Sequence, residues 1–331
     1  MNEQGSRRIG AGVAYFGNRI VRHVAQDMDA LARRGFTGVL HTFSENDLAF
    51  YRETMGEIVA CSHAAGLEVQ IGPWGVCQLF GGEAESRFTA WYPEVGQLLE
   101  TGRRTPSGCP CDPRVRAFVR SWIDAAIDTG ADRVFCDEPH WVHPEHFGLP
   151  AEHWGCRCEH CAERFGGPLP EQLTPEVLAF REAAMVDFVG EFVAYGARQG
   201  AHMTVCLLPL TGGVHGISDW STVAALPGLG TFGTDPYWKA FGEPAAGYVG
   251  EYARRLVALG AEHGPRPQLW IQGFGLDAED ADDIRAAVAT ARAVGIEDLW
   301  TWGFEACGHM SALRGRDPQA VWEVLTEAML A

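Results

Sequence analysis

Short apolar runs alternate with amphipathic stretches along the whole chain. Eight runs of β-type composition predict strands, at residues 9–16, 37–42, 68–74, 133–137, 203–208, 230–235, 268–272 and 298–302. Each run is followed by a segment long enough for a helix, which predicts repeated parallel βαβ units. Eight such units predict an α/β fold, a closed (β/α)8 TIM barrel. An open doubly wound sheet is the alternative, but no GxGxxG opens the first unit.

Helix boundaries are marked by capping residues and glycines. A capping side chain precedes a proline at Asp112-Pro113, Thr174-Pro175 and Asp317-Pro318, which predicts three helix starts. Glycine suits the left-handed turn after a helix, so six glycines predict helix ends before the next strand. They are Gly35, Gly66, Gly130, Gly200, Gly260 and Gly295.

No change of composition divides the chain, so we expect residues 1–331 to form a single barrel domain. Two connections are unusually long: residues 75–111 follow the third predicted strand, and residues 139–173 follow the fourth. Both belong to the carboxyl-terminal side of the strands, where barrel enzymes build their active sites.

Composition and charge narrow the function. With 47% hydrophobic and 21% charged residues, the sequence is typical of a folded globule. The formal charge of −17 disfavours nucleic acid and anionic membranes as partners. No apolar run is long enough for a bilayer, and the first residues lack a signal-peptide pattern, so we expect a cytoplasmic protein. A homo-oligomer is possible.

Cysteine spacing predicts a metal site in the second long connection. This connection contains a C-x-C-x-x-C motif formed by Cys156, Cys158 and Cys161, and the first connection ends in Cys109-Pro110-Cys111. Three close thiols and a fourth from the other connection satisfy a closed, structural zinc site, which would staple residues 139–173 as an insertion. We favour Cys111 over Cys109 as the fourth ligand because it lies nearer a helix start. His160 is a competing ligand, and free thiols or a disulfide are the alternatives.

Two adjacent carboxylates, Asp137 and Glu138, close the fourth predicted strand. Burying them without a purpose is costly. A glutamic acid held among aromatic residues has a raised pKa and can protonate a leaving oxygen, so Glu138 is the leading candidate for a general acid. A salt-bridged surface turn is the alternative.

Other strand ends supply aromatic and polar side chains that suit a sugar. Flat rings stack on the apolar face of a sugar, and polar groups bind its hydroxyls. The expected substrate-binding residues are His41, Trp74, His140, Trp141, Tyr237, Trp238, Gln272 and Trp302. We therefore expect a small carbohydrate substrate and no nucleotide cofactor.

With these residues in place, the whole chain resembles a clan A glycoside hydrolase barrel, in which the acid/base glutamate closes strand four. Asp137-Glu138-Pro139 is similar to the Asn-Glu-Pro often found there. The family 42 β-galactosidases are the nearest likeness, because they pair that glutamate with a zinc held by a similar cysteine motif. The resemblance implies a glutamate nucleophile closing strand seven, where this chain has Gln272 instead.

Three carboxylates can take the second catalytic role. Asp235 ranks first, as nucleophile or as base for a water. Asp137 ranks second, because Asp137-Glu138 resembles the Asp-Glu pair of the family 20 hexosaminidases, in which the aspartate steadies the substrate's own acetamido group. Glu305 ranks third.

Three other functions compete with the glycosidase. A metal-dependent hydrolase would need a site made by His140, His143 and His146, and their loose spacing favours solvated loop residues. A class I aldolase would need Lys239, the only lysine, which we expect at the surface. A sugar-binding barrel without catalysis would bind and not turn over.

Overall fold

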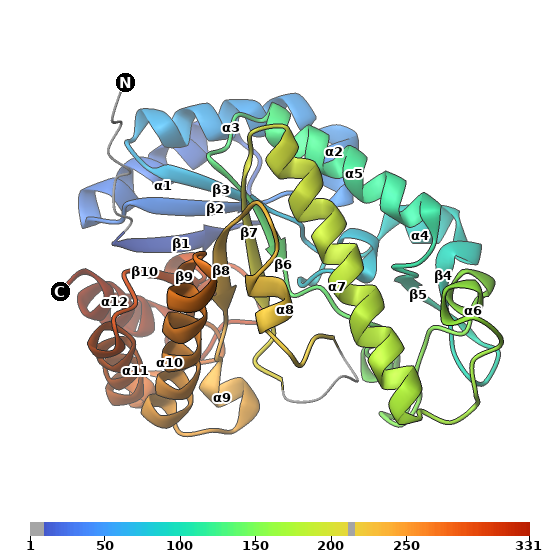
Figure 1. Cartoon of the computed structure of the whole chain (residues 1–331). Helices are drawn as coiled ribbons and strands as arrows, with labels where there is room; N and C mark the ends of the chain where they lie inside the picture. Colours follow the sequence, from blue (N-terminus) through green and yellow to red (C-terminus); the bar gives the residue numbers. More distant parts are fainter. Residues whose placement is uncertain (1–9, 211–215) are drawn as a thin grey trace. The chain divides into compact units, whose positions relative to one another are not determined.

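The computed structural model describes residues 10–210 and 216–331 (Figure 1). Eight strands form a closed barrel in the order β1-β10-β9-β8-β7-β6-β3-β2, which confirms the predicted (β/α)8 fold. β1 pairs in parallel with β2 and β10, β9 with β8 and β10, and β6 with β7. The barrel strands are β1 (Ala11–Tyr15), β2 (Gly38–Thr42), β3 (Glu68–Gly72), β6 (Arg133–Asp137), β7 (His202–Leu207), β8 (Leu229–Thr234), β9 (Arg266–Gln272) and β10 (Asp298–Trp302).

Helices follow the strands, together with short 3-10 segments. The helices are α1 (Val21–Arg34), α2 (Glu45–Phe50), α3 (Arg52–Ala64), α4 (Arg87–Trp91), α5 (Pro113–Asp128), α6 (Glu159–Phe165), α7 (Pro175–Arg198), α8 (Ser221–Ala224), α9 (Trp238–Phe241), α10 (Ala245–His263), α11 (Ala281–Val294) and α12 (Pro318–Leu330). The 3-10 segments are η1 (Val76–Gln78), η2 (Pro93–Val95), η3 (Pro144–Phe147), η4 (Ala278–Asp280) and η5 (Phe304–Cys307). No helix of the described ranges combines the length and apolarity that a bilayer span requires.

All eight predicted strands are present, with ends that shift by at most two residues. Ile9, the first residue of the first predicted strand, lies outside the described residues. The three predicted helix starts are confirmed, since Asp112, Thr174 and Asp317 each accept a backbone N–H of the first turn.

One predicted helix end is wrong. Helix α10 continues through Gly260 to His263, and Gly264 at φ 99° ends it. A methyl group on Gly260 would lie 2.9 Å from the Pro265 carbonyl oxygen and from Pro267 Cγ. Gly260 therefore allows close packing inside a helix, a role that the sequence pattern does not distinguish from a helix end.

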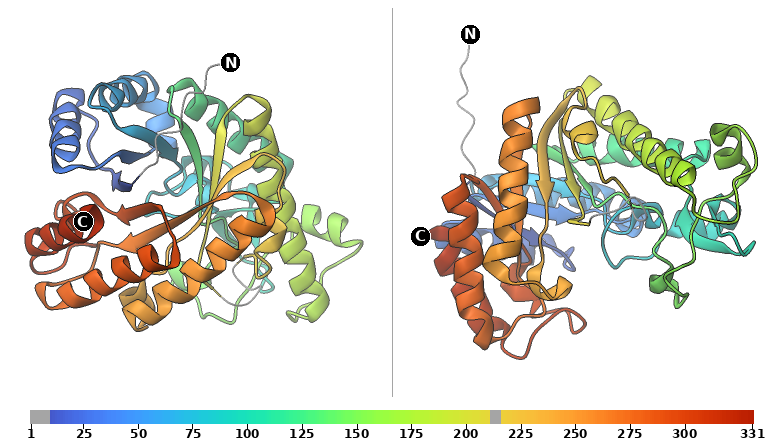
Figure 2. Two further views of the ribbon diagram at one scale, coloured as in Figure 1. Left: turned by 60° about the vertical axis from the view of Figure 1, so that its left-hand side comes forward. Right: turned by 60° about the horizontal axis from the view of Figure 1, so that its bottom comes forward.

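Chain contacts divide the described residues into two compact units. The first contains residues 10–42, 56–70 and 231–331. Its helices α10, α11 and α12 lie side by side (orange to red in Figures 1 and 2). Buried Val24, Met28 and Leu31 line the inner face of α1, and Phe36 stacks on Trp322 at 5.4 Å between ring centroids.

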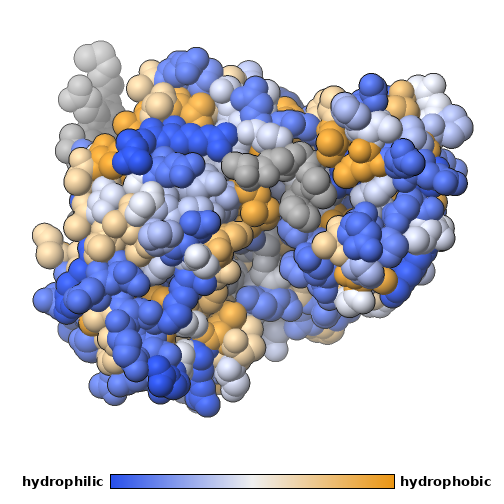
Figure 3. Space-filling model, turned by 90° about the horizontal axis from the view of Figure 1, so that it is seen from below, coloured by the Kyte–Doolittle hydropathy of each residue, from blue (hydrophilic) through white to orange (hydrophobic). Residues whose placement is uncertain are grey.

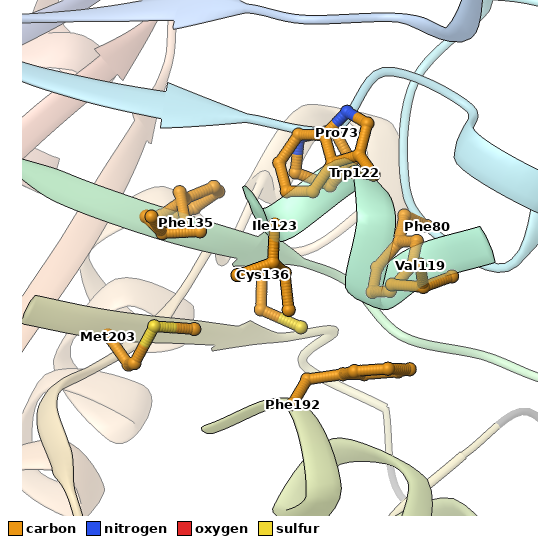
Figure 4. A pocket seen from close by; sticks show the side chains of 10 residues that line it. Pro73, Phe80, Val119, Trp122, Ile123, Phe135, Cys136, Phe192 and Met203 are labelled. Atoms are coloured by element: carbon orange, nitrogen blue, oxygen red, sulfur yellow. The ribbon is translucent and has the colours of Figure 1, made fainter. Parts of the chain in front are cut away.

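The second unit contains residues 43–55, 71–210 and 216–230. Helices α5 and α7 lie against each other in this unit. Figure 4 shows the apolar side chains around a cavity of about 10 Å³ between β6, β7 and these helices, including Trp122, Phe135, Phe192 and Met203. A space of this size holds at most about one water, so this part of the core is closely packed.

The two long connections hold structure that the sequence pattern did not predict. β4 (Gly96–Leu98) and β5 (Arg104–Gly108) form a two-stranded antiparallel sheet within residues 75–111. Buried Gln97 joins this sheet to the second connection: its Nε2 donates to the Gly108 carbonyl and its Oε1 accepts from Val142 N. Arg157 N also donates to the Leu98 carbonyl at 2.8 Å. These hydrogen bonds therefore join the two connections to each other.

Candidate functional site

Asp137 and Glu138 lie together where β6 ends, within the second unit. Glu138 N donates to the Cys206 carbonyl at 3.0 Å, and the Asp137 carbonyl accepts from Gly81 N at 3.1 Å. Glu138 has a φ of 40°, in the left-handed region that a glutamate seldom occupies. Such a backbone conformation costs free energy and persists only where the surrounding structure holds it in place. Residues of this kind cluster at functional sites.

Gly81 brings the two carboxylates close to one point. A methyl group built on Gly81 would lie 2.6 Å from Glu138 Oε2 and 3.0 Å from Asp137 Oδ2. Both oxygens thus occupy the space that any larger residue at position 81 would need. The sequence does not point to Gly81, because nothing in a Gly-Gly pair reveals what faces it.

The electrostatics of the pair favour a bound proton. Burial, together with the neighbouring charges of Glu138 and then Glu83, raises the pKa of Asp137 well above its usual range. Two carboxylates this close resist simultaneous ionisation, so a proton on the pair is stabilised. Glu83, a third carboxylate that no sequence pattern marks, accepts a hydrogen bond from Trp74 Nε1 at 2.8 Å.

The neighbours of the pair differ in what they can offer a ligand. Two hydrogen bonds hold His140 in place. Its Nδ1 lies 2.6 Å from the Glu138 carbonyl oxygen, and its backbone N–H donates to the Leu79 carbonyl. Trp74 is half-buried, which leaves part of its ring exposed. Trp141 is wholly buried and its Nε1 donates to the Arg181 carbonyl, so it acts as a core residue and offers no face to a sugar.

Three predicted site residues of the first unit, His41, Trp238 and Gln272, are buried. His41 is fully buried and bonded to Ser62 at 2.8 Å, and burial lowers its pKa to about 3. Trp238 is buried as well. Gln272 accepts from Lys239 N and Ala240 N and donates to the Phe274 carbonyl, so its amide holds the chain around α9.

Four other predicted residues of this unit also lie at or beyond strand ends. Asp235 follows β8 and is buried, and its carbonyl accepts from Tyr237 N at 2.7 Å. Tyr237 meets Phe274 edge to face, and half-buried Trp302 stacks on Phe16 at 5.0 Å. Glu305 is exposed in η5 at a φ of 49°.

The residues of the competing functions have structural explanations. Lys239 forms an ion pair with Asp280, as expected for a surface lysine. His140 contacts His143 edge to face, and His143 stacks on His146. Among the described residues, these histidines are in no group with metal-ligand spacing.

Four buried cysteines of the second unit form a group with metal-ligand spacing. The sulfurs of Cys109, Cys156, Cys158 and Cys161 all lie within 4.8 Å of one another. Cys109 Sγ is 3.4 Å from Cys161 Sγ and 3.5 Å from Cys158 Sγ. Tetrahedral Zn–S bonds of 2.3 Å place sulfurs about 3.8 Å apart, so the group fits a four-thiolate metal site.

This geometry favours Cys109 over Cys111, the cysteine preferred from the sequence. Cys109 belongs to the group of four, whereas Cys111 lies beside it and donates its backbone N–H to Cys109 Sγ at 3.4 Å. Cys156 Sγ accepts from Leu98 N and Cys158 N in the same way. Such N–H donors stabilise a thiolate, the form that binds metal. His160 lies 3.6 Å from Asp112 and is outside the group.

Comparisons with known proteins support the fold. No family model matches the chain, and no curated protein matches it in sequence. The chain is similar in structure to the catalytic domain of β-amylase from Paenibacillus polymyxa, with a TM-score of 0.65, 9% identity and 97% of each chain covered. It is also similar to an endo-1,4-β-mannanase from Rhizomucor miehei, with a TM-score of 0.65, 11% identity, and 99% of this chain and 96% of that chain covered.

A third similar structure is GH5_18 from Streptomyces cattleya in complex with GlcNAc, with a TM-score of 0.61 and 13% identity over 98% of this chain and 80% of that chain. At these identities the similarity shows the fold alone, a (β/α)8 barrel.

Proposed function

We propose that the chain is a glycoside hydrolase-like enzyme that cleaves a glycosidic bond of a small sugar or glycoconjugate, with Glu138 as general acid/base. The observation that carries the proposal is the Asp137–Glu138 pair at the end of β6, with a strained backbone and two oxygens converging on Gly81. The similar folds named β-amylase and endo-mannanase support a carbohydrate as substrate class.

The proposed acid catalysis depends on the Asp137–Glu138 pair, which holds a proton more readily than either carboxylate would alone. Glu138 donates that proton to the leaving oxygen as the bond between the anomeric carbon and this oxygen breaks. Water supplies the hydroxyl that ends on the anomeric carbon, and its proton restores Glu138. The raised pKa of Asp137 supports a proton shared by the pair.

The second catalytic role has three candidates: Asp235, Asp137 and Glu305. Asp137 gains support because it shares the Gly81 contact with Glu138. In that arrangement Asp137 steadies the acetamido group of a 2-acetamido sugar while this group attacks the anomeric carbon, and no enzymic nucleophile is needed. The GlcNAc bound in the similar GH5_18 structure suggests including such sugars among the substrates tested.

The test compares wild type, Glu138→Gln and Glu145→Gln on a panel of aryl glycosides that includes 2-acetamido sugars. Glu145 is an exposed carboxylate in the same connection and serves as the matched control. We expect turnover in wild type and in the control. In Glu138→Gln we expect large losses with poor leaving groups and smaller losses with activated ones, as for a missing acid. Turnover confined to acetamido sugars assigns the second role to Asp137. A wild type that binds sugars without turnover supports the non-catalytic barrel instead.

The four-cysteine group extends the proposal to a structural zinc held by Cys109, Cys156, Cys158 and Cys161. The four thiolates would fill the coordination sphere, so the ion would cross-link residues 75–111 to residues 139–173 and take no part in the reaction. The chain would then be a single barrel domain with a zinc-stapled insertion at residues 139–173.

A further inference from the structure

An aromatic surface on the second unit shares no residue with the candidate active site. Six large hydrophobic side chains in the described ranges are exposed, and four of them gather here: Phe50, Tyr51, Trp91 and Tyr92, with exposed fractions of 63%, 39%, 67% and 47%. They come from the ends of α2 and α4 (Figure 1). Figure 3 shows one face of the molecule, on which hydrophilic residues are interspersed with several hydrophobic patches. A local concentration of exposed aromatic side chains is typical of a binding site.

A pocket of about 310 Å³ opens between α2, α4 and α5 at this surface. Its walls are mostly apolar, and Phe88 stacks on Phe118 at 4.4 Å with the rings nearly parallel. The lining residues are Glu45, Leu48, Ala49, Arg87, Phe88, Trp91, Tyr92 and Phe118. The volume is in the range of small-molecule sites.

The two charged residues of this pocket play different roles. Glu45 is buried, and its carboxylate accepts from Cys77 N, Ser86 Oγ and Phe88 N at 2.6–2.7 Å. Three donors satisfy this carboxylate, so Glu45 holds α2 against the loop before α4 and is not available to a ligand.

Arg87 is the group left for recognition. Its Cζ lies 4.7 Å from the ring centroids of both Phe50 and Trp91, which hold the guanidinium between two exposed rings. Its one hydrogen bond, to Asn46 Oδ1, is long at 3.4 Å. Within residues 10–210 and 216–331, Arg87 has no carboxylate partner, in a chain with 43 acidic residues. A stacked guanidinium still offers its N–H donors to a carboxylate.

We propose that this pocket binds a small amphipathic carboxylate, with its aromatic body against Phe88 and Phe118 and its carboxylate on Arg87. The apolar walls exclude a fully polar occupant. The single unneutralised cation selects an anion over a neutral analogue.

In the test, the purified full chain is titrated with 1-naphthaleneacetate and, separately, with the neutral 1-naphthaleneacetamide. Calorimetry measures the binding of each ligand. We expect saturable binding of one carboxylate per chain and at least tenfold weaker binding of the amide. Arg87→Gln loses this preference. Arg52→Gln, which removes an exposed arginine paired with Asp128, keeps it. Ala49→Phe, which fills the pocket from the exposed face of α2, weakens both ligands.

Three results overturn the proposal. One is the absence of saturable binding in a wild type whose thermal unfolding is normal. Another is equal binding of acid and amide, or an unchanged preference in Arg87→Gln. The third is a wild-type dimer in light scattering that Trp91→Ser dissociates, which would show that a second copy of the chain covers this surface. None of these results depends on glycosidase activity.

Discussion

Replacing Gly81 by alanine tests the candidate active site by a single methyl group. The new Cβ would lie 2.6 Å from Glu138 Oε2, whereas an ordinary contact is at least 3.4 Å, so the Glu138 carboxylate must move by about 0.8 Å. A misplacement of about 1 Å can cost about 100-fold in rate, or about 2.7 kcal/mol of transition-state stabilisation. Gly81 has no positive φ, so the alanine backbone is unstrained and the fold should survive.

The assay is kcat/KM on the aryl glycoside that wild type cleaves best, with thermal unfolding measured in parallel. Gly247→Ala is the matched control, because Gly247 is exposed in α10 and nothing lies within 4 Å of the added methyl group. We expect Gly81→Ala to lose about 100-fold in rate while keeping most of its stability. Gly247→Ala should keep its activity. A folded Gly81→Ala with wild-type kcat/KM would refute the role of the Asp137–Glu138 pair.

Three further predictions concern metal and pH. Elemental analysis of the purified protein should find one zinc per chain. Cys156→Ser should lose the metal and unfold at a lower temperature, whereas the control Cys61→Ser should do neither. Equal metal content in both variants would contradict the zinc site. Because the pKa of Asp137 is raised in the folded state, its contribution to stability falls as pH rises above about 4. Asp137→Asn should therefore unfold at higher temperature than wild type at pH 7, and the difference should shrink near pH 4; a less stable variant at pH 7 would contradict this. The depressed pKa of His41 acts in the opposite direction, since the unfolded chain binds its proton first as pH falls from about 6.5 toward 3. In urea titrations over that range, wild type should lose more stability than His41→Gln, and parallel losses would count against a buried neutral His41.

The barrel could be predicted because its signal is repeated and local. Eight apolar runs, each followed by a helical period, allow few arrangements of a parallel sheet. The capping residues before Pro113, Pro175 and Pro318 fix helix starts by local chemistry alone, and all three are confirmed. Gly260 failed as a helix end because glycine also serves close packing, and that depends on a neighbouring segment.

The site could be predicted only in part, because the position of a residue at a strand end does not fix where its side chain goes. Trp141 and Trp238 follow strands, yet both are buried. Gln272 ends a strand and contacts backbone groups instead of open space. Gly81 and Glu83 come near Asp137 through a turn of the first long connection, and no periodic pattern marks that turn.

The fourth cysteine shows how a long-range contact overrides a local argument. Cys111 lies beside Asp112, which caps α5, and this nearness to a helix made it the preferred ligand. The unpredicted pairing of β5 with β4 instead holds the chain up to Gly108, and Cys109 N donates to the Val95 carbonyl at 2.9 Å. Cys109 is therefore held at the end of the small sheet, where its sulfur joins the other three. Cys109→Ser should consequently lose zinc more completely than Cys111→Ser in the same elemental analysis, and the reverse order would assign the fourth ligand to Cys111.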